Sequence, residues 1–232
     1  MNDPLELGGR ADAARQRIAA AALRAGRDPG VVRLMAVTKT VPRSVVEDAL
    51  AVGLSLFGEN RVHEALDKYA GLADRCELHL IGHLQRNKAG PAAGLFACVQ
   101  SIDKAETAVA LAGRLEALGR RMDVLLEFNT SGEASKSGAA DRDALLACLD
   151  AVQSLPALRV RGLMTVGPLG GDPAGARRAF RLLGTLFEEV RSTRALEGFD
   201  TLSMGMSGDF ETAVEEGSTL VRLGTVLFGS RP

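Results

Sequence analysis

The sequence has 232 residues, of which 46% are hydrophobic and 25% charged, so the chain can bury a core without disulfide or metal cross-links. Its 28 basic and 29 acidic residues give a formal net charge of -1, which argues against nucleic acid or an anionic membrane as a partner. One tyrosine and no tryptophan also leave no aromatic platform for single strands. We therefore expect any bound anion to be small.

Cysteine usage and the N-terminal region indicate a cytoplasmic protein. Cys76, Cys98 and Cys148 are odd in number, far apart and free of C-x-x-C spacing, so neither a disulfide framework nor a zinc knuckle is expected. The N-terminal region mixes acidic and basic residues, unlike a secretory or transit peptide. No run approaches the roughly 20 apolar residues of a membrane span.

The elements expected in chain order begin with a helix over about residues 4–25, after which short apolar runs alternate with amphipathic segments. The strand candidates are residues 33–39, 56–60, 77–82, 98–102, 123–129, 159–166, 201–206 and 220–228. Helical patterns between them include residues 44–53, 104–119, 142–155 and 179–192, with apolar positions spaced by three and four. Several of these helical patterns end at a glycine, as helix C-termini often do.

Strand and helix in unbroken alternation predict a parallel sheet of the α/β class. Eight such units predict a single (β/α)8 TIM barrel over residues 1–232, with an extra N-terminal helix within residues 1–30 packed on the barrel. An open doubly wound sheet is the alternative. The first strand is followed by TKTVP and not by G-x-G-x-x-G, so the usual dinucleotide cradle is absent and the barrel is favoured. The Gly- and Pro-rich residues 167–175 fit a loop between strand and helix.

Lys39 ends an apolar strand pattern, and Pro42 blocks any continuation of that strand. A barrel presents its reactive residues at the carboxyl ends of its strands. A lysine sheltered there would lose solvation, which lowers its pKa and lets the neutral amine form a Schiff base with an aldehyde. The alternative is a solvated lysine that merely follows the strand, and position alone favours it.

Two half-sites for an anion lie near the C-terminus of the chain. Ser207 and the N–H of Gly208 fall at the start of a helix that follows the seventh strand, while Gly224 and Thr225 fall near the eighth. In a barrel these loops commonly hold phosphate. Taken singly, Ser207 or Asp209 fits a helix cap, and Gly224 fits a packing position. Together with Lys39 they match pyridoxal phosphate (PLP), which needs a lysine for its aldehyde and a cup for its phosphate.

The chain resembles the pyridoxal-phosphate-binding homeostasis proteins, which are built like the N-terminal barrel domain of alanine racemase. The resemblance covers nearly the whole length and rests on six ordered blocks: AVTKTVP, FGENRVHE, HLIGHLQRNK, SGEASKSG, VRGLMTV and LSMGMSGDFETAVEEGSTLVRLGTVLFG. It implies that Lys39 forms a Schiff base with PLP and that Asn60 lies beside the cofactor ring. It further implies that Ser207, Gly224 and Thr225 bind the phosphate and that Arg222 faces the pyridine nitrogen.

An arginine at the pyridine nitrogen would damp carbanion chemistry. A guanidinium keeps its proton, so the ring nitrogen stays unprotonated and the ring becomes a poorer electron sink. The alternative for Arg222 is an ion pair with an acid such as Glu127. Tyr69 falls in the helical segment after the second strand, where a packing role is the simplest interpretation.

Two other groups have weaker claims to a function. His79 and His83 make H-x3-H, but four residues of strand span about 13 Å, too far for one metal ion. Lys136 lies among small residues after the fifth strand, where it is either a second anion ligand or a solvated loop lysine. We therefore expect no metal site and keep Lys136 as a candidate only.

Racemases need a base on each face of the substrate, and in the two-domain racemases of this resemblance one base comes from an added C-terminal domain. This sequence ends just after its eighth strand, so we expect a monomeric carrier that acts in intracellular PLP homeostasis and transfer, not an enzyme. Apo forms of PLP-dependent enzymes would be its recipients. Two alternatives stay open: a small stand-alone amino-acid racemase that recruits a base such as Lys136, and a barrel enzyme that acts on a phosphorylated metabolite through Lys39 without a cofactor.

Overall fold

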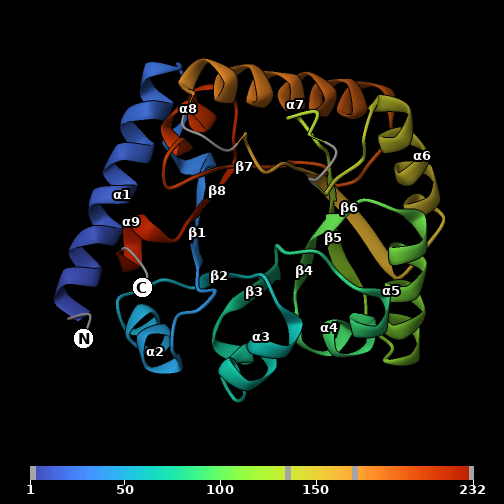
Figure 1. Ribbon diagram of the computed structural model, residues 1–232, viewed down its shortest axis with the longest axis horizontal. Coiled ribbons are helices and arrows are strands. Elements are labelled where there is room, and N and C mark those ends of the chain that lie inside the picture. The colour runs from blue at the N-terminus through green and yellow to red at the C-terminus, as the bar shows by residue number, and fades with distance from the viewer. Residues whose placement is uncertain (1–3, 134–136, 169–171, 230–232) are drawn as a thin grey trace.

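The computed structural model describes residues 4–133, 137–168 and 172–229. Its eight parallel strands form a closed barrel in which each strand pairs with the next and β8 pairs with β1 (Figure 1). The strands are β1 Arg33–Val37, β2 Leu56–Glu59, β3 Glu77–Leu80, β4 Cys98–Ile102, β5 Met122–Glu127, β6 Leu158–Met164, β7 Thr201–Met206 and β8 Leu220–Leu223. The predicted barrel is confirmed, and the open doubly wound sheet is wrong.

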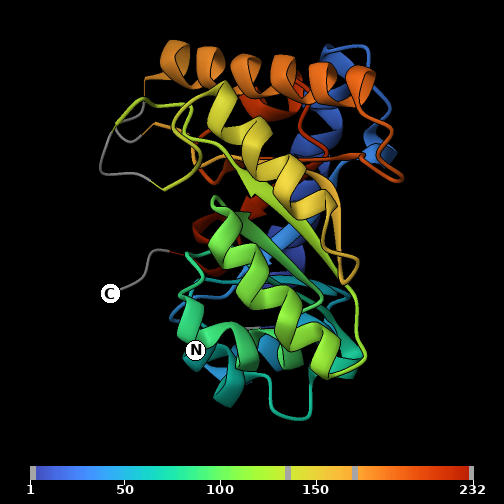
Figure 2. The same cartoon turned by 90° about the vertical axis from the view of Figure 1, so that its right-hand side faces the viewer.

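Helices surround the barrel on its outside (Figures 1 and 2). The α-helices are α1 Pro4–Arg24, α2 Arg43–Ala51, α3 Val62–Lys68, α4 Ala89–Leu95, α5 Ala105–Ala117, α6 Arg142–Gln153, α7 Pro173–Thr193, α8 Phe210–Glu215 and α9 Thr225–Phe228. Single 3-10 turns are η1 Pro29–Val31, η2 Ala73–Arg75 and η3 Arg86–Lys88. Among the helices of these described residues, none is long and apolar enough to cross a bilayer.

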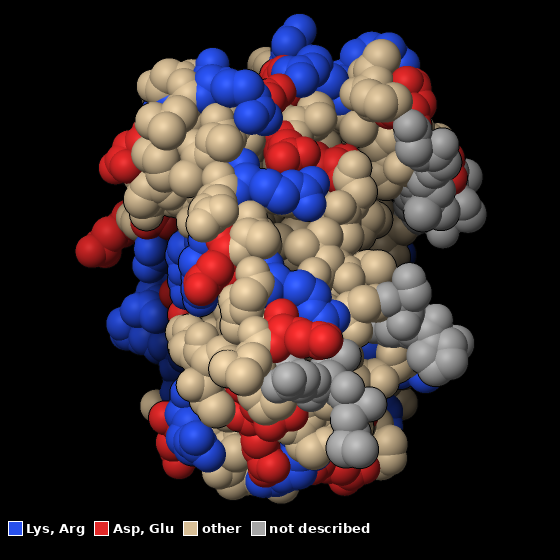
Figure 3. All heavy atoms as spheres, turned by 90° about the vertical axis from the view of Figure 1, so that its left-hand side faces the viewer, with Lys and Arg blue, Asp and Glu red and all other residues tan. Residues whose placement is uncertain are grey.

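The N-terminal helix α1 packs against α8 and α9, as Figure 1 shows. It buries a stripe that includes Leu7 and Ile18, while Arg17 and Arg24 on its surface pair with glutamates of α8. The Arg17 guanidinium also lies 4.6 Å from the centre of the Phe210 ring. Charges of both signs are interspersed over the side of the molecule where α1 lies (Figure 3), which fits the balanced composition.

Two element boundaries differ from the sequence prediction by five or more residues. Strand β8 ends at Leu223, so residues 224–228, expected as strand, are instead the turn at Gly224 and helix α9. The N–H groups of Leu227 and Phe228 both bond to the carbonyl of Gly224, which closes this helical turn. Helix α7 begins at Pro173, six residues before the predicted 179, because Asp172 caps its N-terminus and proline suits its first position.

Apolar side chains form one core between the barrel and its helices and smaller clusters inside the barrel. The alternation of each strand sends one residue outward to the helices and the next into the barrel. Met35, Leu56 and Leu220 make one interior cluster, and Cys98, Leu125 and Met164 make another. The interior also holds buried polar residues, which connect to the site described next.

Candidate functional site

A pocket of about 300 Å³ opens at the carboxyl ends of β1, β2, β7 and β8. All six residues predicted to bind the cofactor line it: Lys39, Asn60, Ser207, Arg222, Gly224 and Thr225. Its remaining lining is largely apolar and consists of Val37, Ile81, Val166, Met206 and Gly208. Residues up to 186 positions apart in the sequence, from Lys39 to Thr225, thus meet at one rim of the barrel.

Lys39 lies two residues beyond β1 and is exposed, which agrees with the solvated alternative that position alone favours and not with the sheltered one. Its neighbour Thr38 is fully buried and donates its N–H to Gly58 of β2, so the β1–β2 pairing extends to that residue. Thr40, on the other side, has a left-handed backbone with φ of 61°. The chain therefore turns sharply at Lys39, which is one of the residues that line the pocket.

Ser207 connects the ends of β7 and β8. Its hydroxyl oxygen accepts the backbone N–H of Gly224 at 3.2 Å and of Val226 at 3.3 Å. Two N–H donors therefore converge on one oxygen atom at the pocket wall, which is the arrangement an oxygen of a phosphate group also needs. Thr225 between them is exposed and adds a hydroxyl to the same wall.

The turn after β7 differs in one respect from the prediction. Helix α8 starts only at Phe210, so Ser207 and Gly208 precede the helix and do not lie in its first turn. The cause is local: the Asp209 carboxylate accepts the N–H of Met206 at 2.6 Å, and the Asp209 N–H bonds back to the Met206 carbonyl. Asp209 therefore closes the turn before α8. It occupies the N-cap position of that helix, as the helix-cap alternative held, but its side chain makes no capping hydrogen bond to the helix.

Arg222 projects from β8 into the barrel interior and is only 4% exposed. Its two terminal nitrogens donate to the Ser203 hydroxyl and to the Thr165 carbonyl, both at 2.7 Å. Burial lowers its pKa to about 10, although Glu127 and Asp209 act in the opposite direction. No ion pair joins Arg222 to Glu127, both of which are among the described residues, so the ion-pair alternative is wrong. At neutral pH the guanidinium is a cation held by neutral acceptors.

A chain of hydrogen bonds continues from Arg222 through the barrel to its opposite end. The Ser203 hydroxyl donates to Gln100 Oε1 at 2.7 Å, and Gln100 Nε2 lies 2.8 Å from His79 Nδ1. His79 Nε2 in turn lies 2.7 Å from Glu77 Oε1. Both ring nitrogens of His79 are thus occupied by protein partners. The sequence prediction missed Ser203 and Gln100, and the only available signal was the presence of polar residues inside apolar strands.

Glu127 was named from the sequence only as a possible ion-pair partner of Arg222. It ends β5 and is 6% exposed. Burial raises its pKa to about 7, and the nearby negative charge of Asp103 adds to that increase, while Arg222 opposes it. Its signal in the sequence was an acid at the end of an apolar run.

Tyr69, expected as a packing residue, is fully buried against Phe57 with ring centres 5.9 Å apart.

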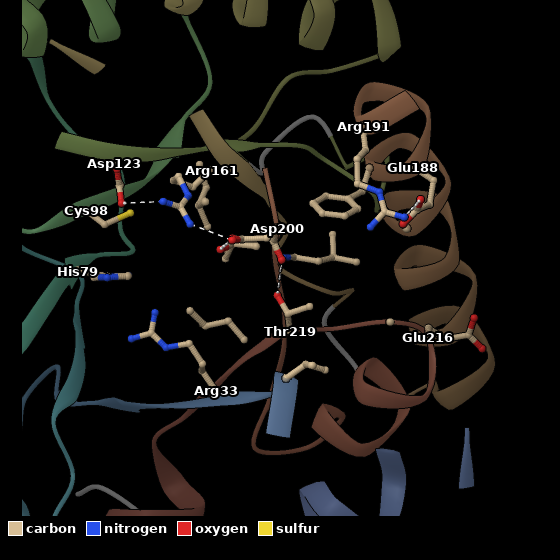
Figure 4. Close-up of a pocket in the computed structure, with 18 of the residues that line it drawn as sticks. Arg33, His79, Cys98, Asp123, Arg161, Glu188, Arg191, Asp200, Glu216 and Thr219 are labelled. Atoms are coloured by element: carbon tan, nitrogen blue, oxygen red, sulfur yellow. Dashed lines mark hydrogen bonds and ion pairs between the residues drawn. The ribbon is translucent and has the colours of Figure 1, made fainter. Parts of the chain in front are cut away.

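A larger cavity, of about 1300 Å³, opens at the amino ends of the strands (Figure 4). Its walls carry many charges, most of which are in ion pairs: Arg161 contacts Asp123 and Asp200, and Arg33 pairs with Glu77. Reactive groups of (β/α)8 barrels lie at the carboxyl ends of the strands. We therefore place the candidate site in the smaller pocket.

Lys136, the candidate for a second anion ligand, lies outside the described residues.

Comparison with known proteins agrees with this fold. Residues 10–232 match the alanine racemase N-terminal domain family. The chain is 47% identical over 216 residues to the pyridoxal phosphate homeostasis protein of Pseudomonas aeruginosa, covering 93% of this chain and 91% of that protein. The structure of PipY from Synechococcus elongatus with PLP bound superposes with a TM-score of 0.80 at 36% identity, covering 93% and 99% of the two chains.

An uncharacterised protein from Bifidobacterium adolescentis has a closer backbone, with a TM-score of 0.91 at 36% identity, covering 98% of this chain and 97% of that one. The chain therefore belongs to the alanine racemase N-terminal domain family, whose barrel it shares. Within that family it belongs with the pyridoxal phosphate homeostasis proteins, so the resemblance noted in the sequence is confirmed.

Proposed function

We propose that this protein binds PLP in the carboxyl-end pocket, holds it through Lys39 as a Schiff base, and acts in PLP homeostasis by storing and handing over the cofactor. The observation that supports this most is the convergence of all six predicted residues on one pocket. The relatives named above, and PipY with its bound PLP, add support from outside the chain.

The residues of the pocket fit the parts of the cofactor. Ser207, Gly224 and Thr225 lie on one wall of the pocket and would hold the phosphate oxygens, with the Ser207 hydroxyl fixed by the N–H groups of Gly224 and Val226. The Arg222 guanidinium suits the pyridine nitrogen, because a permanent donor leaves that nitrogen unprotonated. Asn60 would contact the ring. When bound, PLP supplies an aldehyde that reacts reversibly with amines and a ring that withdraws electrons.

Storage and release fit this site better than catalysis. Lys39 is exposed, so water and acceptor molecules have access to the atom that would hold the cofactor. Arg222 at the ring would limit electron withdrawal, which racemisation requires. The curated relatives are named for homeostasis and not for an enzyme activity. A cytoplasmic location, a monomeric state and apo-enzyme recipients stay predictions.

Borohydride reduction followed by peptide mass mapping tests the proposal. Reduction converts an imine into a stable secondary amine, so the loaded protein should carry a pyridoxyl group on the peptide that contains Lys39. Lys39→Ala should lose this label, whereas Lys88→Ala, which removes an exposed lysine that does not line the pocket, should keep it. A loaded protein without a label on Lys39 would disprove the proposed anchor.

The racemase alternative requires a separate measurement. The loaded protein is incubated with L-alanine, and D-alanine is followed with time. We expect no formation above that of free PLP. Turnover that depends on Lys39 would favour the racemase instead.

A further inference from the structure

The segment that carries Lys39 is held by α3, the helix that follows β2. Lys68 Nζ donates to the carbonyl oxygen of Thr38 at 2.7 Å. The Glu64 carboxylate accepts the backbone N–H of Thr40 at 2.6 Å. These two groups belong to the peptide units directly before and directly after the α-carbon of Lys39. Each peptide unit next to Lys39 is therefore bonded to a charged side chain of α3.

Glu64 and Lys68 also bond to each other and to a third charge. The two residues are one helical turn apart, and Lys68 Nζ lies 2.7 Å from Glu64 Oε1. Lys68 Nζ also lies 2.8 Å from Glu59 Oε1. Lys68 is 8% exposed, and its ammonium has three acceptors, which is the number of protons it can donate. Because all three protons of this buried ammonium are donated to protein acceptors, the ammonium holds those three acceptors in place.

Glu64 keeps its negative charge in this cluster. Burial alone would raise its pKa, but the hydrogen bonds from Lys68 and from the Thr40 N–H outweigh that effect, and the pKa is lowered. Glu59, which is fully buried, shows the opposite balance, because burial raises its pKa despite the bonds from Lys68 and Thr38. Glu64 is therefore ionised at neutral pH, and its carboxylate accepts the Thr40 N–H in that state.

The backbone at Thr40 needs such a restraint. Its φ of 61° lies in the left-handed region, which residues other than glycine adopt at an energetic cost. On the other side, the Thr38 hydroxyl is anchored at 2.7 Å from both Glu59 Oε1 and the Tyr69 hydroxyl. The Lys39 segment is thus fixed on both sides, while the Lys39 side chain itself is exposed.

We propose that Glu64 and Lys68 are positioning residues for Lys39, which fix the backbone from which its amine reaches into the pocket. This inference rests on the proposed function, since it concerns the lysine that would bind the aldehyde of PLP. A flexible, exposed lysine side chain can be oriented only from its backbone, and covalent bond formation depends on the alignment of the two reacting atoms.

Two variants of Glu64 and two ligands test the proposal. Glu64→Ala removes the acceptor of the Thr40 N–H, and Glu64→Gln keeps an oxygen that can accept it. Pyridoxine 5′-phosphate carries an alcohol where PLP carries an aldehyde, so it can use the phosphate and ring contacts without reacting with Lys39. The control is Glu47→Ala, which breaks the pair with Arg43 on α2 but touches neither peptide unit of Lys39.

Glu64→Ala should weaken PLP binding about tenfold, the size expected for one charge-assisted hydrogen bond, and should change pyridoxine 5′-phosphate binding by less than about twofold. Glu64→Gln should recover most of the PLP affinity, and Glu47→Ala should bind both ligands like the wild type. Equal losses for both ligands would show a general disturbance of the pocket and overturn the proposal. Unchanged PLP binding by Glu64→Ala would also overturn it.

Lys68 is tested in a way that avoids a buried unpaired acid. Lys68→Met alone leaves Glu59 without its partner, so the double variant Glu59→Gln, Lys68→Met is compared as well. We expect the double variant to melt as one folded unit and to lose PLP affinity but not pyridoxine 5′-phosphate affinity. If wild-type Lys39 takes no pyridoxyl label, the proposed function fails. If it is labelled and these variants bind PLP normally, only the positioning role fails.

Discussion

The hydroxyl of Ser207, just after β7, accepts the backbone N–H of Gly224, just after β8, over 3.2 Å. The same oxygen accepts the N–H of Val226. This one side chain therefore closes the rim between two neighbouring strands at the wall that we assign to the phosphate of PLP.

Ser207→Ala should weaken PLP binding about tenfold and lower the free energy of unfolding by about 1 kcal/mol, because two N–H groups lose their acceptor. Fluorescence titration with PLP and urea denaturation measure the two effects. Ser192→Ala, which removes an exposed hydroxyl on α7 bonded to the Glu189 carbonyl, is the matched control. Binding of pyridoxal, which lacks the phosphate, should change little. A similar loss for pyridoxal would argue against the phosphate role.

Gln100 connects His79 to Ser203 in the barrel interior and is fully buried. Gln100→Leu should lower the free energy of unfolding by about 3 kcal/mol, because it leaves polar atoms of both neighbours without a partner. Urea denaturation measures this loss. Gln153→Leu makes the same change on the exposed face of α6 and should alter stability by less than about 0.5 kcal/mol. Equal effects of the two substitutions would contradict the importance of the buried chain.

Glu127 should make stability depend on pH. Burial raises its pKa to about 7, whereas a glutamate in the unfolded chain has a pKa of about 4.3. Between these values the folded state binds more protons, so its stability falls as pH rises, by about 4 kcal/mol in total. Glu127→Gln should remove this loss, so its stability relative to wild type should increase from about pH 5 to about pH 8.

Urea denaturation at the two pH values measures the Glu127 effect. The exposed Glu106→Gln at the start of α5 serves as the control and should follow the pH dependence of the wild type. A parallel pH dependence for wild type and Glu127→Gln would show that Glu127 does not titrate in this range.

Gly82 allows the backbone after β3 to approach the backbone of Asn60, a residue of the pocket. A β-carbon at position 82 would lie 2.2 Å from the carbonyl oxygen of Asn60, so one of the two segments would have to move. Gly82→Ala should therefore lower the free energy of unfolding by about 2 kcal/mol and weaken PLP binding. Gly94→Ala in α4 meets no atom within 4 Å and should be neutral or slightly stabilising. Thermal melts measure the stability of both variants, and PLP titration measures their affinity for PLP.

The residues of the pocket were accessible to sequence reasoning for identifiable reasons. Lys39 ends one apolar strand pattern and Ser207 follows another, and in a parallel barrel all such ends meet at one rim, whereas Gly224 lay inside the run predicted as the eighth strand. Arg222 and Asn60 were assigned by resemblance to a family, since nothing in their spacing predicts a ring contact. Whether Lys39 is sheltered or solvated was left open by the sequence, because exposure depends on the loops that surround the rim and not on the strand that precedes it.

The periodicity of the chain by itself determined the number of strands, their parallel order and the rim on which the polar residues gather, because these follow from local patterns of apolar residues. Tertiary structure alone decided which side chains bond across the barrel. The contacts of Ser203 with Gln100 and of Lys68 with the Thr38 carbonyl join residues that no local pattern relates. Such contacts exist only once the barrel closes, since closure brings strand interiors and neighbouring loops within hydrogen-bonding distance.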